Sequence, residues 1–219
     1  MKKILTFLLL GGCILSLQGC ISFGDEDNNV TKVNSITDHD ADFNEDDYIN
    51  NYYSTISEAI KHNNFADGKK ADFTLKQTIK IIEDTKSCNF YGTIIQPGGE
   101  EIFVVMRFRL KIMDGKKNYS NPLAYSPSYD FINNTLYKNK SVVEEQEMFL
   151  PINNDPYAIK SVEKYPNFIW SLTAKKDVKK IKVNNQKPTE IIPFKIGKDQ
   201  LYFYYFDDLK NNGEFTITN

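Results

Sequence analysis

The chain has 219 residues, a formal net charge of −2, and 13% aromatic residues. This length suits a globular domain that buries a core of its own. The small net charge and the lack of a nucleic-acid-binding motif argue against DNA or RNA as a partner. Three cysteines and two histidines offer few groups for zinc binding or thiol catalysis.

The first 20 residues form a distinct segment. Lys2 and Lys3 precede an apolar stretch over residues 4–17, and the run Leu17-Gln18-Gly19-Cys20 closes it. A basic start, a short apolar stretch and small residues before a cleavage site are typical of an export signal. The stretch is shorter than the roughly 20 residues that a membrane-spanning helix needs.

The run that ends at Cys20 resembles the signal of bacterial lipoproteins. The resemblance implies that residues 1–19 are a signal peptide, that Cys20 carries a diacylglycerol, and that an acyl group such as palmitate caps the new amino terminus. Two alternatives stay open. Cleavage at Leu10-Gly11-Gly12-Cys13 would leave an apolar stretch of only residues 4–10, and the segment could also stay uncleaved as an anchor.

The same resemblance implies a lipid-anchored protein of the cell envelope. Ile21 stands where enteric lipoproteins kept at the inner membrane carry Asp. We therefore expect the outer membrane in a two-membrane bacterium, or the outer face of the cell membrane in a single-membrane one. Cys88 is then the one thiol of the mature chain, so no intramolecular disulfide forms. We expect the Cys88 thiol to be semi-buried in a strand or turn and not to act as a nucleophile.

Residues 20–47 are strongly acidic. They hold nine acidic residues against Lys32 alone, a net charge of −8. Such a segment is expected to be a solvated, flexible tether. Its alternate acidic positions have the spacing of the oxygen ligands in a calcium loop, but Phe43 and Ile49 stand where that loop needs glycine and glutamate. We therefore predict no metal site here.

Residues 48–64 have helical spacing. The apolar positions recur at steps of three and four, at Ile49, Tyr52, Tyr53, Ile56 and Ile60. The pattern predicts one amphipathic helix of about four turns, with an apolar face that docks on the following domain. A tyrosine-rich face that binds a partner is the alternative.

Residues 65–219 show mainly a period of two. One predicted strand places Phe73, Leu75, Ile79 and Ile81 on a single side. The clearest strand follows the turn Gln96-Pro97-Gly98-Gly99 and alternates Ile102, Val104, Met106, Phe108, Leu110 and Ile112 with Phe103, Val105, Arg107, Arg109 and Lys111. Further strand-like runs cover 131–137, 147–152, 168–174, 178–183, 189–196, 201–206 and 214–218, although 131–134 and 141–144 could be helical turns.

This order of elements predicts a mainly β fold, an antiparallel β-sandwich or barrel after one amphipathic helix. The strand Phe73-Thr74-Leu75-Lys76, the turn Gly98-Gly99-Glu100 and the strand at 102–108 resemble small bacterial lipoproteins with an immunoglobulin-like, telokin-like extracellular domain behind an acidic linker. The resemblance implies an immunoglobulin-like β-sandwich that serves as a binding or interaction module.

The polar and aromatic residues offer several candidate sites. A carboxylate pair for sugar hydrolysis could come from Glu144, Glu145 and Glu147 or from Asp207 and Asp208. The aromatic run 202–206, with Trp170 and Tyr125 or Tyr129, could line a groove, although alternation in a strand favours the core. Basic residues that could attract an anionic envelope polymer are Arg107, Arg109, Lys111, Lys175, Lys176, Lys179 and Lys180.

These patterns lead to one expected function and two alternatives. We expect a non-enzymatic envelope lipoprotein that binds an unknown protein or envelope polymer, with Cys20 as the lipid attachment site. No catalytic residue, cofactor or metal ligand is predicted. The alternatives are an immunity or phage-exclusion lipoprotein and a carboxylate-pair glycan hydrolase.

Overall fold

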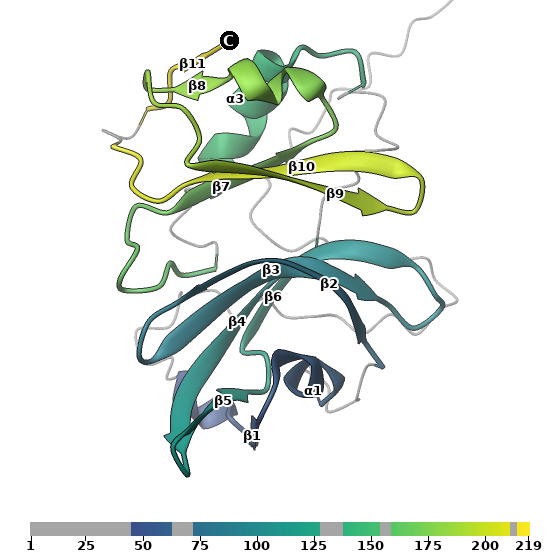
Figure 1. Ribbon diagram of the computed structural model, residues 1–219, viewed down its shortest axis with the longest axis vertical. Helices are drawn as coiled ribbons and strands as arrows, with labels where there is room; N and C mark the ends of the chain where they lie inside the picture. Colours follow the sequence, from purple (N-terminus) through teal and green to yellow (C-terminus); the bar gives the residue numbers. More distant parts are fainter. Residues whose placement is uncertain (1–44, 63–71, 128–137, 154–158, 211–213) are drawn as a thin grey trace, which may run out of the picture.

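Two antiparallel sheets, stacked face to face, form the centre of the protein (Figure 1). The computed structural model describes residues 45–62, 72–127, 138–153, 159–210 and 214–219. The expected signal peptide, Cys20, nearly all of the acidic tether and the strand expected at 131–137 lie outside the described residues. Within the described parts the fold is mainly β with few helices, as the sequence predicts.

The strands divide between the sheets in chain order. The first sheet has the order β1-β5-β4-β3-β2, with β6 paired to β4; the second has the order β7-β10-β9. The strand bounds are β1 Tyr52–Tyr53, β2 Thr74–Glu83, β3 Ser87–Ile95, β4 Glu101–Met113, β5 Lys116–Ser120, β6 Ala124–Pro127, β7 Ile169–Thr173, β9 Glu190–Ile196 and β10 Asp199–Phe206. A small ribbon pairs β8, Lys182–Val183, with β11, Ile217–Thr218.

Helices flank the two sheets. They are α1 Ile56–Lys61, α3 Val142–Asn153 and the 3₁₀ turns η1 Glu45–Tyr48 and η2 Lys176–Lys180. Helix α1 lies on the side of the first sheet that faces away from the second, and α3 lies beside the second sheet (Figure 1). In the parts that the structure describes, no helix has the length and apolar character needed to cross a membrane.

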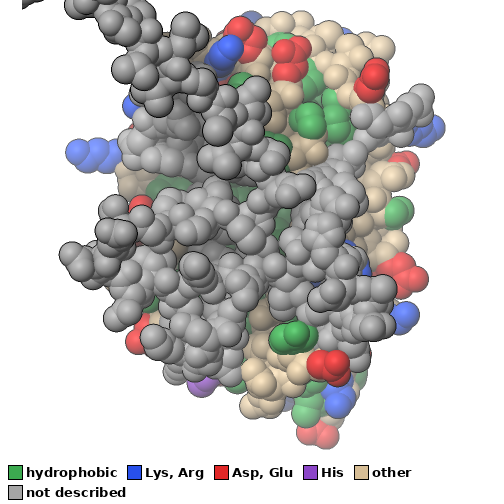
Figure 2. Space-filling view, turned by 180° about the vertical axis from the view of Figure 1, so that it is seen from behind, with side chains coloured by type: hydrophobic (Ala, Val, Ile, Leu, Met, Phe, Trp, Pro, Cys, Tyr) green, Lys and Arg blue, Asp and Glu red, His purple; other side chains and the backbone are tan. Residues whose placement is uncertain are grey.

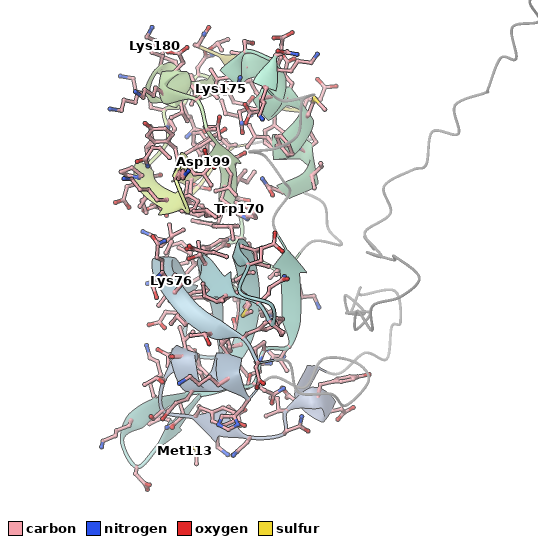
Figure 3. The ribbon with its side chains drawn as sticks, turned by 90° about the vertical axis from the view of Figure 1, so that its right-hand side faces the viewer. Lys76, Met113, Trp170, Lys175, Lys180 and Asp199 are labelled. Carbon is pink, nitrogen blue, oxygen red and sulfur yellow. The ribbon has the colours of Figure 1, made fainter. Side chains whose placement is uncertain are left out.

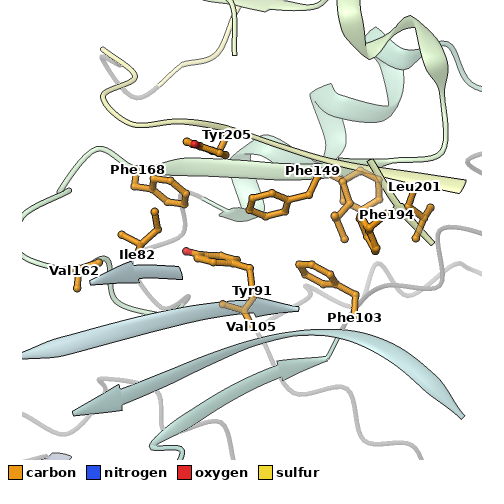
Figure 4. Packing of buried hydrophobic residues seen from close by; sticks show 12 residues of the cluster. Ile82, Tyr91, Phe103, Val105, Phe149, Val162, Phe168, Phe194, Leu201 and Tyr205 are labelled. Carbon is orange, nitrogen blue, oxygen red and sulfur yellow. The ribbon is translucent and has the colours of Figure 1, made fainter. Parts of the chain in front are cut away.

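The main hydrophobic core lies between the sheets (Figure 4). Phe103 and Val105 of β4 enter it from one side, and Leu201, Phe203 and Tyr205 of β10 enter from the other. The alternate residues of both strands pack into two outer clusters, one with α1 and one with α3. Residues 103–108 of β4 and 201–206 of β10 are thus buried on both faces, which confirms the sequence prediction that the aromatic run 202–206 is a central core strand.

Strand β3 is a central strand that the sequence pattern did not reveal. It pairs with β2 on one side and β4 on the other, and its first eight residues are buried. Gly92 is required there, because an added Cβ would lie 2.2 Å from Phe90 Cζ and 2.3 Å from the Gln77 carbonyl oxygen. Polar residues and this glycine interrupt the apolar pattern in β3.

The predicted helix at 48–64 is wrong in its first half. Tyr52 and Tyr53 form β1 instead, paired with Ser120 and Tyr119 of β5. Helix α1 begins later because the Thr55 side chain accepts a hydrogen bond from the Glu58 amide at 3.1 Å, which caps the helix. Its apolar face does dock on the first sheet, as expected.

Strand β2 also departs from the expected pattern. Its register with β3 shifts twice, between Leu75 and Gln77 and between Thr78 and Lys80. Such bulges change which face later side chains occupy. Ile81 therefore packs with the α1 cluster, whereas Ile79 packs with the inter-sheet core.

The strand expected at 147–152 is wrong, since these residues belong to α3. The helix is capped reciprocally: the Glu144 amide donates to Ser141 Oγ at 3.2 Å and the Ser141 amide donates to Glu144 Oε2 at 2.8 Å. Its buried positions have helical spacing but include two polar residues, and they are Val142, Glu145, Gln146, Phe149 and Leu150. Those two polar residues conceal the amphipathic pattern.

Candidate functional site

A cluster of lysines lies at one end of the molecule (Figure 3). Residues 175–182 contain five lysines and one acidic residue, and we call the five side chains the lysine surface: Lys175, Lys176, Lys179, Lys180 and Lys182. All but Lys175 are exposed, and Lys175 is half-buried. Arg107, Arg109 and Lys111, which the sequence grouped with these lysines, belong to the other sheet.

Buried side chains fix the lysine surface to the fold. Val178 and Ile181, three residues apart around η2, are almost fully buried, and so is Val183 of β8. This spacing matches a 3₁₀ turn, in which every third side chain lies on the same face. The buried side chains anchor the backbone of this segment, and the lysines between them therefore face solvent.

Hydrogen bonds to the C-terminal segment fix the turn that follows the lysine surface. Asn184 has a φ of 49° and follows β8. Its amide donates to the Thr216 carbonyl at 2.8 Å, and its side-chain oxygen accepts from the Thr216 amide at 2.8 Å. The side-chain nitrogen also donates to the Lys210 carbonyl at 3.0 Å. This turn thus joins β8 to the C-terminal part of the chain, at Lys210 and Thr216.

A buried carboxyl group lies beneath the lysine surface. Glu145 of α3 is only 2% exposed, and its Oε2 lies 3.9 Å from the Lys175 ammonium. Burial raises the pKa of this carboxyl to about 7, against the opposing effects of a hydrogen bond from Thr173 and the charge of Lys175. At neutral pH, Glu145 therefore exists in both protonation states.

Gln146 is the centre of a second buried polar group beside Glu145. Its side-chain oxygen accepts hydrogen bonds from Tyr204 Oη at 2.7 Å and from Ser171 Oγ, and its side-chain nitrogen donates to the Leu172 carbonyl at 3.2 Å. Burial raises the pKa of Tyr204. Each polar atom of Gln146 is thus used within the structure, so this group stabilises the packing of α3 against β7.

A third polar group joins the two sheets at their edge. Lys80 Nζ of β2 lies 2.5 Å from Tyr205 Oη of β10, and Tyr205 Oη donates to Glu190 Oε2 of β9 at 2.6 Å. Although desolvation opposes it, contact with Tyr205 and Glu190 raises the pKa of Lys80. Burial and the Glu190 contact raise the pKa of Tyr205. Both groups keep their protons at neutral pH, which suits a clamp between sheets and not a nucleophile.

The candidate hydrolase carboxylates have separate surroundings. Glu144 caps α3, Glu145 faces Lys175, and Glu147 is exposed. Asp208 Oδ1 accepts a hydrogen bond from Asn167 at 2.7 Å, and the Asp207 amide donates to Thr189. Within the described parts of the chain, no group of three or more histidine, cysteine, aspartate or glutamate side chains is placed to hold a metal ion.

Of the three residues proposed to line a groove with the aromatic run, the structure describes the side chain of Trp170. Trp170 packs in the inter-sheet core among the rings of Tyr91, Phe103 and Phe203, with centroid distances of 5.5, 5.7 and 5.8 Å. Trp170 is therefore partly buried against the core. The other two candidates for such a groove are Tyr125 and Tyr129, and the structure does not describe their side chains.

Arg107 and Cys88 are buried as well. Arg107 donates to Asn89 Oδ1 at 3.3 Å and to the Lys160 carbonyl at 2.9 Å, so it does not belong to an exposed basic face. Arg109 pairs with Asp46 at 3.1 Å. Cys88 is fully buried, and burial raises the pKa of its thiol to about 12, which leaves no thiolate for nucleophilic chemistry.

The chain matches no protein-family model, no curated protein and no solved structure. Its candidate function is therefore argued from its own residues.

Proposed function

We propose that this protein is a lipid-anchored lipoprotein of the cell envelope that acts as a non-enzymatic binding module. The lysine surface is the observation that carries the binding role. It concentrates positive charge on a backbone that Val178 and Ile181 hold in place, and such a surface attracts a partner of opposite charge. The partner would be an anionic envelope polymer or an acidic protein.

The anchor is proposed from the run that ends at Cys20, whose lipid would hold the chain at a bilayer. The arrangement of the described part is compatible with this role. The described chain begins at η1, in the lower half of Figure 1, whereas Lys180 lies at the opposite end of the long axis in Figure 3. A protein attached through its N-terminus would thus present the lysine surface away from the membrane.

The packing supports a binding role over catalysis. Glu144 caps α3, Glu145 is buried beside Lys175, and the residues of the aromatic run pack in the hydrophobic clusters. Immunoglobulin-type folds exchange strands between two sheets through Greek-key connections. Here the described strands of the first sheet all precede those of the second, so the chain does not alternate between the two sheets. The proposed likeness to an immunoglobulin-like sandwich therefore rests on the two stacked antiparallel sheets.

The anchor is tested by expressing the wild type and Cys20→Ala in a bacterial host. Intact mass and detergent partitioning are compared. We expect the wild type to lose residues 1–19, gain acyl mass and enter the detergent phase, while the variant does neither. Equal behaviour of the two proteins would overturn the lipoprotein assignment.

The lysine surface is tested with two anionic polymers, polyphosphate and polygalacturonate. Lys179→Glu with Lys180→Glu reverses two charges there, and Lys195→Glu with Lys198→Glu reverses two exposed charges elsewhere. We expect the first pair to weaken binding about tenfold at low salt and the second pair to have little effect. Equal effects of both pairs, or no binding by the wild type, would remove the lysine surface as a polymer site.

A further inference from the structure

The β4–β5 hairpin extends past the rest of the first sheet. Strand β4 pairs with β3 only as far as Arg109, and from Leu110 to Met113 it pairs with β5 alone. Asp114 and Gly115, both with positive φ, form the turn. The hairpin therefore ends as a two-stranded ribbon, and its tip lies at the end of the molecule opposite Lys180 (Figure 3).

Apolar side chains at this tip face solvent. Ile112 is 65% exposed and Met113 is 43% exposed. The other large hydrophobic side chains described as exposed are Tyr48 of η1 and Met148 of α3. Neither residue belongs to any of the three hydrophobic clusters. Their exposure side by side at a hairpin tip favours a role in contact with another surface.

Lysines flank the apolar tip on both strands, and the exposed Asp114 lies in the turn between them. Lys111 and Lys116 are exposed, and Lys117 pairs with Glu83 of β2. Lys111 Nζ lies 5.5 Å from the centroid of the Tyr52 ring. Figure 2 shows hydrophobic, basic and acidic side chains next to one another at this lower end. Apolar groups flanked by lysines suit the boundary of a bilayer, where the apolar part enters the lipid and the ammonium groups reach the headgroups.

The described chain begins in the same half of the molecule as this tip. Turn η1 lies in the same half of the molecule as the hairpin (Figure 1), and Arg109 of β4 pairs with Asp46 of η1. Residues 21–44 separate η1 from Cys20. In general, a segment of that length can bridge about 25–30 Å on average, which is comparable with the width of a small domain. A membrane that holds Cys20 is therefore within reach of the tip.

We propose that Ile112 and Met113 insert into the interfacial layer of the bilayer that carries the lipid anchor. The lysines beside them contact anionic headgroups. This inference rests on the lipid anchor of the proposed function. The contact would orient the domain on the membrane, with the hairpin toward the lipid and the lysine surface away from it.

The test uses the acylated protein in vesicles of phosphatidylethanolamine and phosphatidylglycerol. A spin label is placed at Met113→Cys, and the control label is at Lys180→Cys on the opposite end. Cys88 is buried and does not compete for the label. Oxygen, which concentrates in lipid, and a polar nickel chelate, which stays in water, are used as relaxation probes. We expect the ratio of oxygen to nickel accessibility to be severalfold higher at 113 than at 180.

A second comparison removes the apolar tip. The label is placed at Lys116→Cys, with the tip either native or carrying Ile112→Ser and Met113→Ser. Both residues are exposed, so the fold should be unaffected. We expect the serine tip to lower the lipid accessibility of the label severalfold, because serine gains little from burial in lipid.

The outcomes separate this inference from the proposed function. If acylated protein sediments with the vesicles but the label at 113 is as water-accessible as that at 180, the tip does not insert and the inference fails while the anchor stands. If the protein carries no acyl group and stays in solution, the anchor itself fails. If the label at 113 is immobilised by native membranes and not by lipid vesicles, the tip binds a membrane protein, which also overturns insertion.

Discussion

The buried carboxyl group of Glu145 makes the stability of the fold depend on pH. The folded structure raises its pKa from 4.5 to about 7, so the folded chain holds this proton more tightly than the unfolded chain does. The resulting stabilisation is complete below pH 4.5 and is lost as the pH rises through about 7. Glu145→Gln removes this dependence, because the amide carries no charge at any pH.

The magnitude follows from the two pKa values. A rise from 4.5 to about 7 corresponds to about 3 kcal/mol, at about 1.4 kcal/mol per pH unit. The effective dielectric constant inside a protein is higher than that of a dry interior, which reduces this to about 2 kcal/mol. Relative to the wild type, Glu145→Gln should therefore gain about 2 kcal/mol in free energy of unfolding between about pH 4.5 and about pH 8.

Urea denaturation across this pH range measures the effect, with fluorescence of Trp170, the single tryptophan, as the signal. Glu147→Gln is the matched control, since it removes a carboxylate from the exposed side of the same helix. The difference between Glu145→Gln and wild type should increase with pH, and that for Glu147→Gln should stay nearly constant. A difference for Glu145→Gln that is constant, or that decreases as the pH rises, would refute the argument that burial dominates this carboxyl.

Three further predictions concern packing, reactivity and helix capping. Gly92→Ala should lower the free energy of unfolding by about 3 kcal/mol, because the new Cβ meets Phe90 and a backbone oxygen; a urea midpoint within error of the wild type would contradict this. Cys88 should react with a thiol reagent at least about a thousandfold more slowly in the folded protein than in urea, and rapid labelling of native protein would show that the thiol is accessible. Thr55→Ala should cost about 1 kcal/mol by removing the cap of α1, measured by thermal denaturation beside Thr55→Ser, which keeps the acceptor; equal losses in both variants would argue against the cap.

The sequence predicted those strands in which the alternation is strong. Strand β4 changes faces at every residue, with apolar side chains on both, and β10 does the same with aromatics. Strand β3 could not be predicted in this way, because Asn89, Gly92 and Thr93 interrupt its apolar residues. In the folded protein a buried Arg107 and the side chain of Glu101 pair with two of these polar groups.

The helix boundaries depend on capping residues and not on the spacing of apolar residues. The spacing of apolar residues before α1 fits a helix, yet Thr55 and Glu58 carry the capping pattern that marks where the helix begins. In α3 the carboxyl of Glu145 and the amide of Gln146 occupy inward positions of the helix. Their partners lie on β7 and β10, and a single sequence does not show which distant residues satisfy a buried polar group.

The candidate surfaces were predictable only in part. The lysines at 175–182 are adjacent in sequence and remain together in the fold. Lys80 and Tyr205 are 125 residues apart, so their contact depends on how the two sheets pack. Ile112 is exposed because the pairing of β3 with β4 extends only to Arg109. The alternation of residues in β4 does not indicate where that pairing stops.

The separation of the two sheets along the chain has a consequence for biogenesis. All strands of the first sheet precede those of the second in the chain, so the hydrogen bonds of the first sheet can form once residues through 127 are available. Tyr91, Phe103 and Val105 would then stay uncovered until β7, β9 and β10 follow. If the chain is exported from its N-terminus, as proposed, it would display this apolar face during the interval, and slow translocation would then promote aggregation.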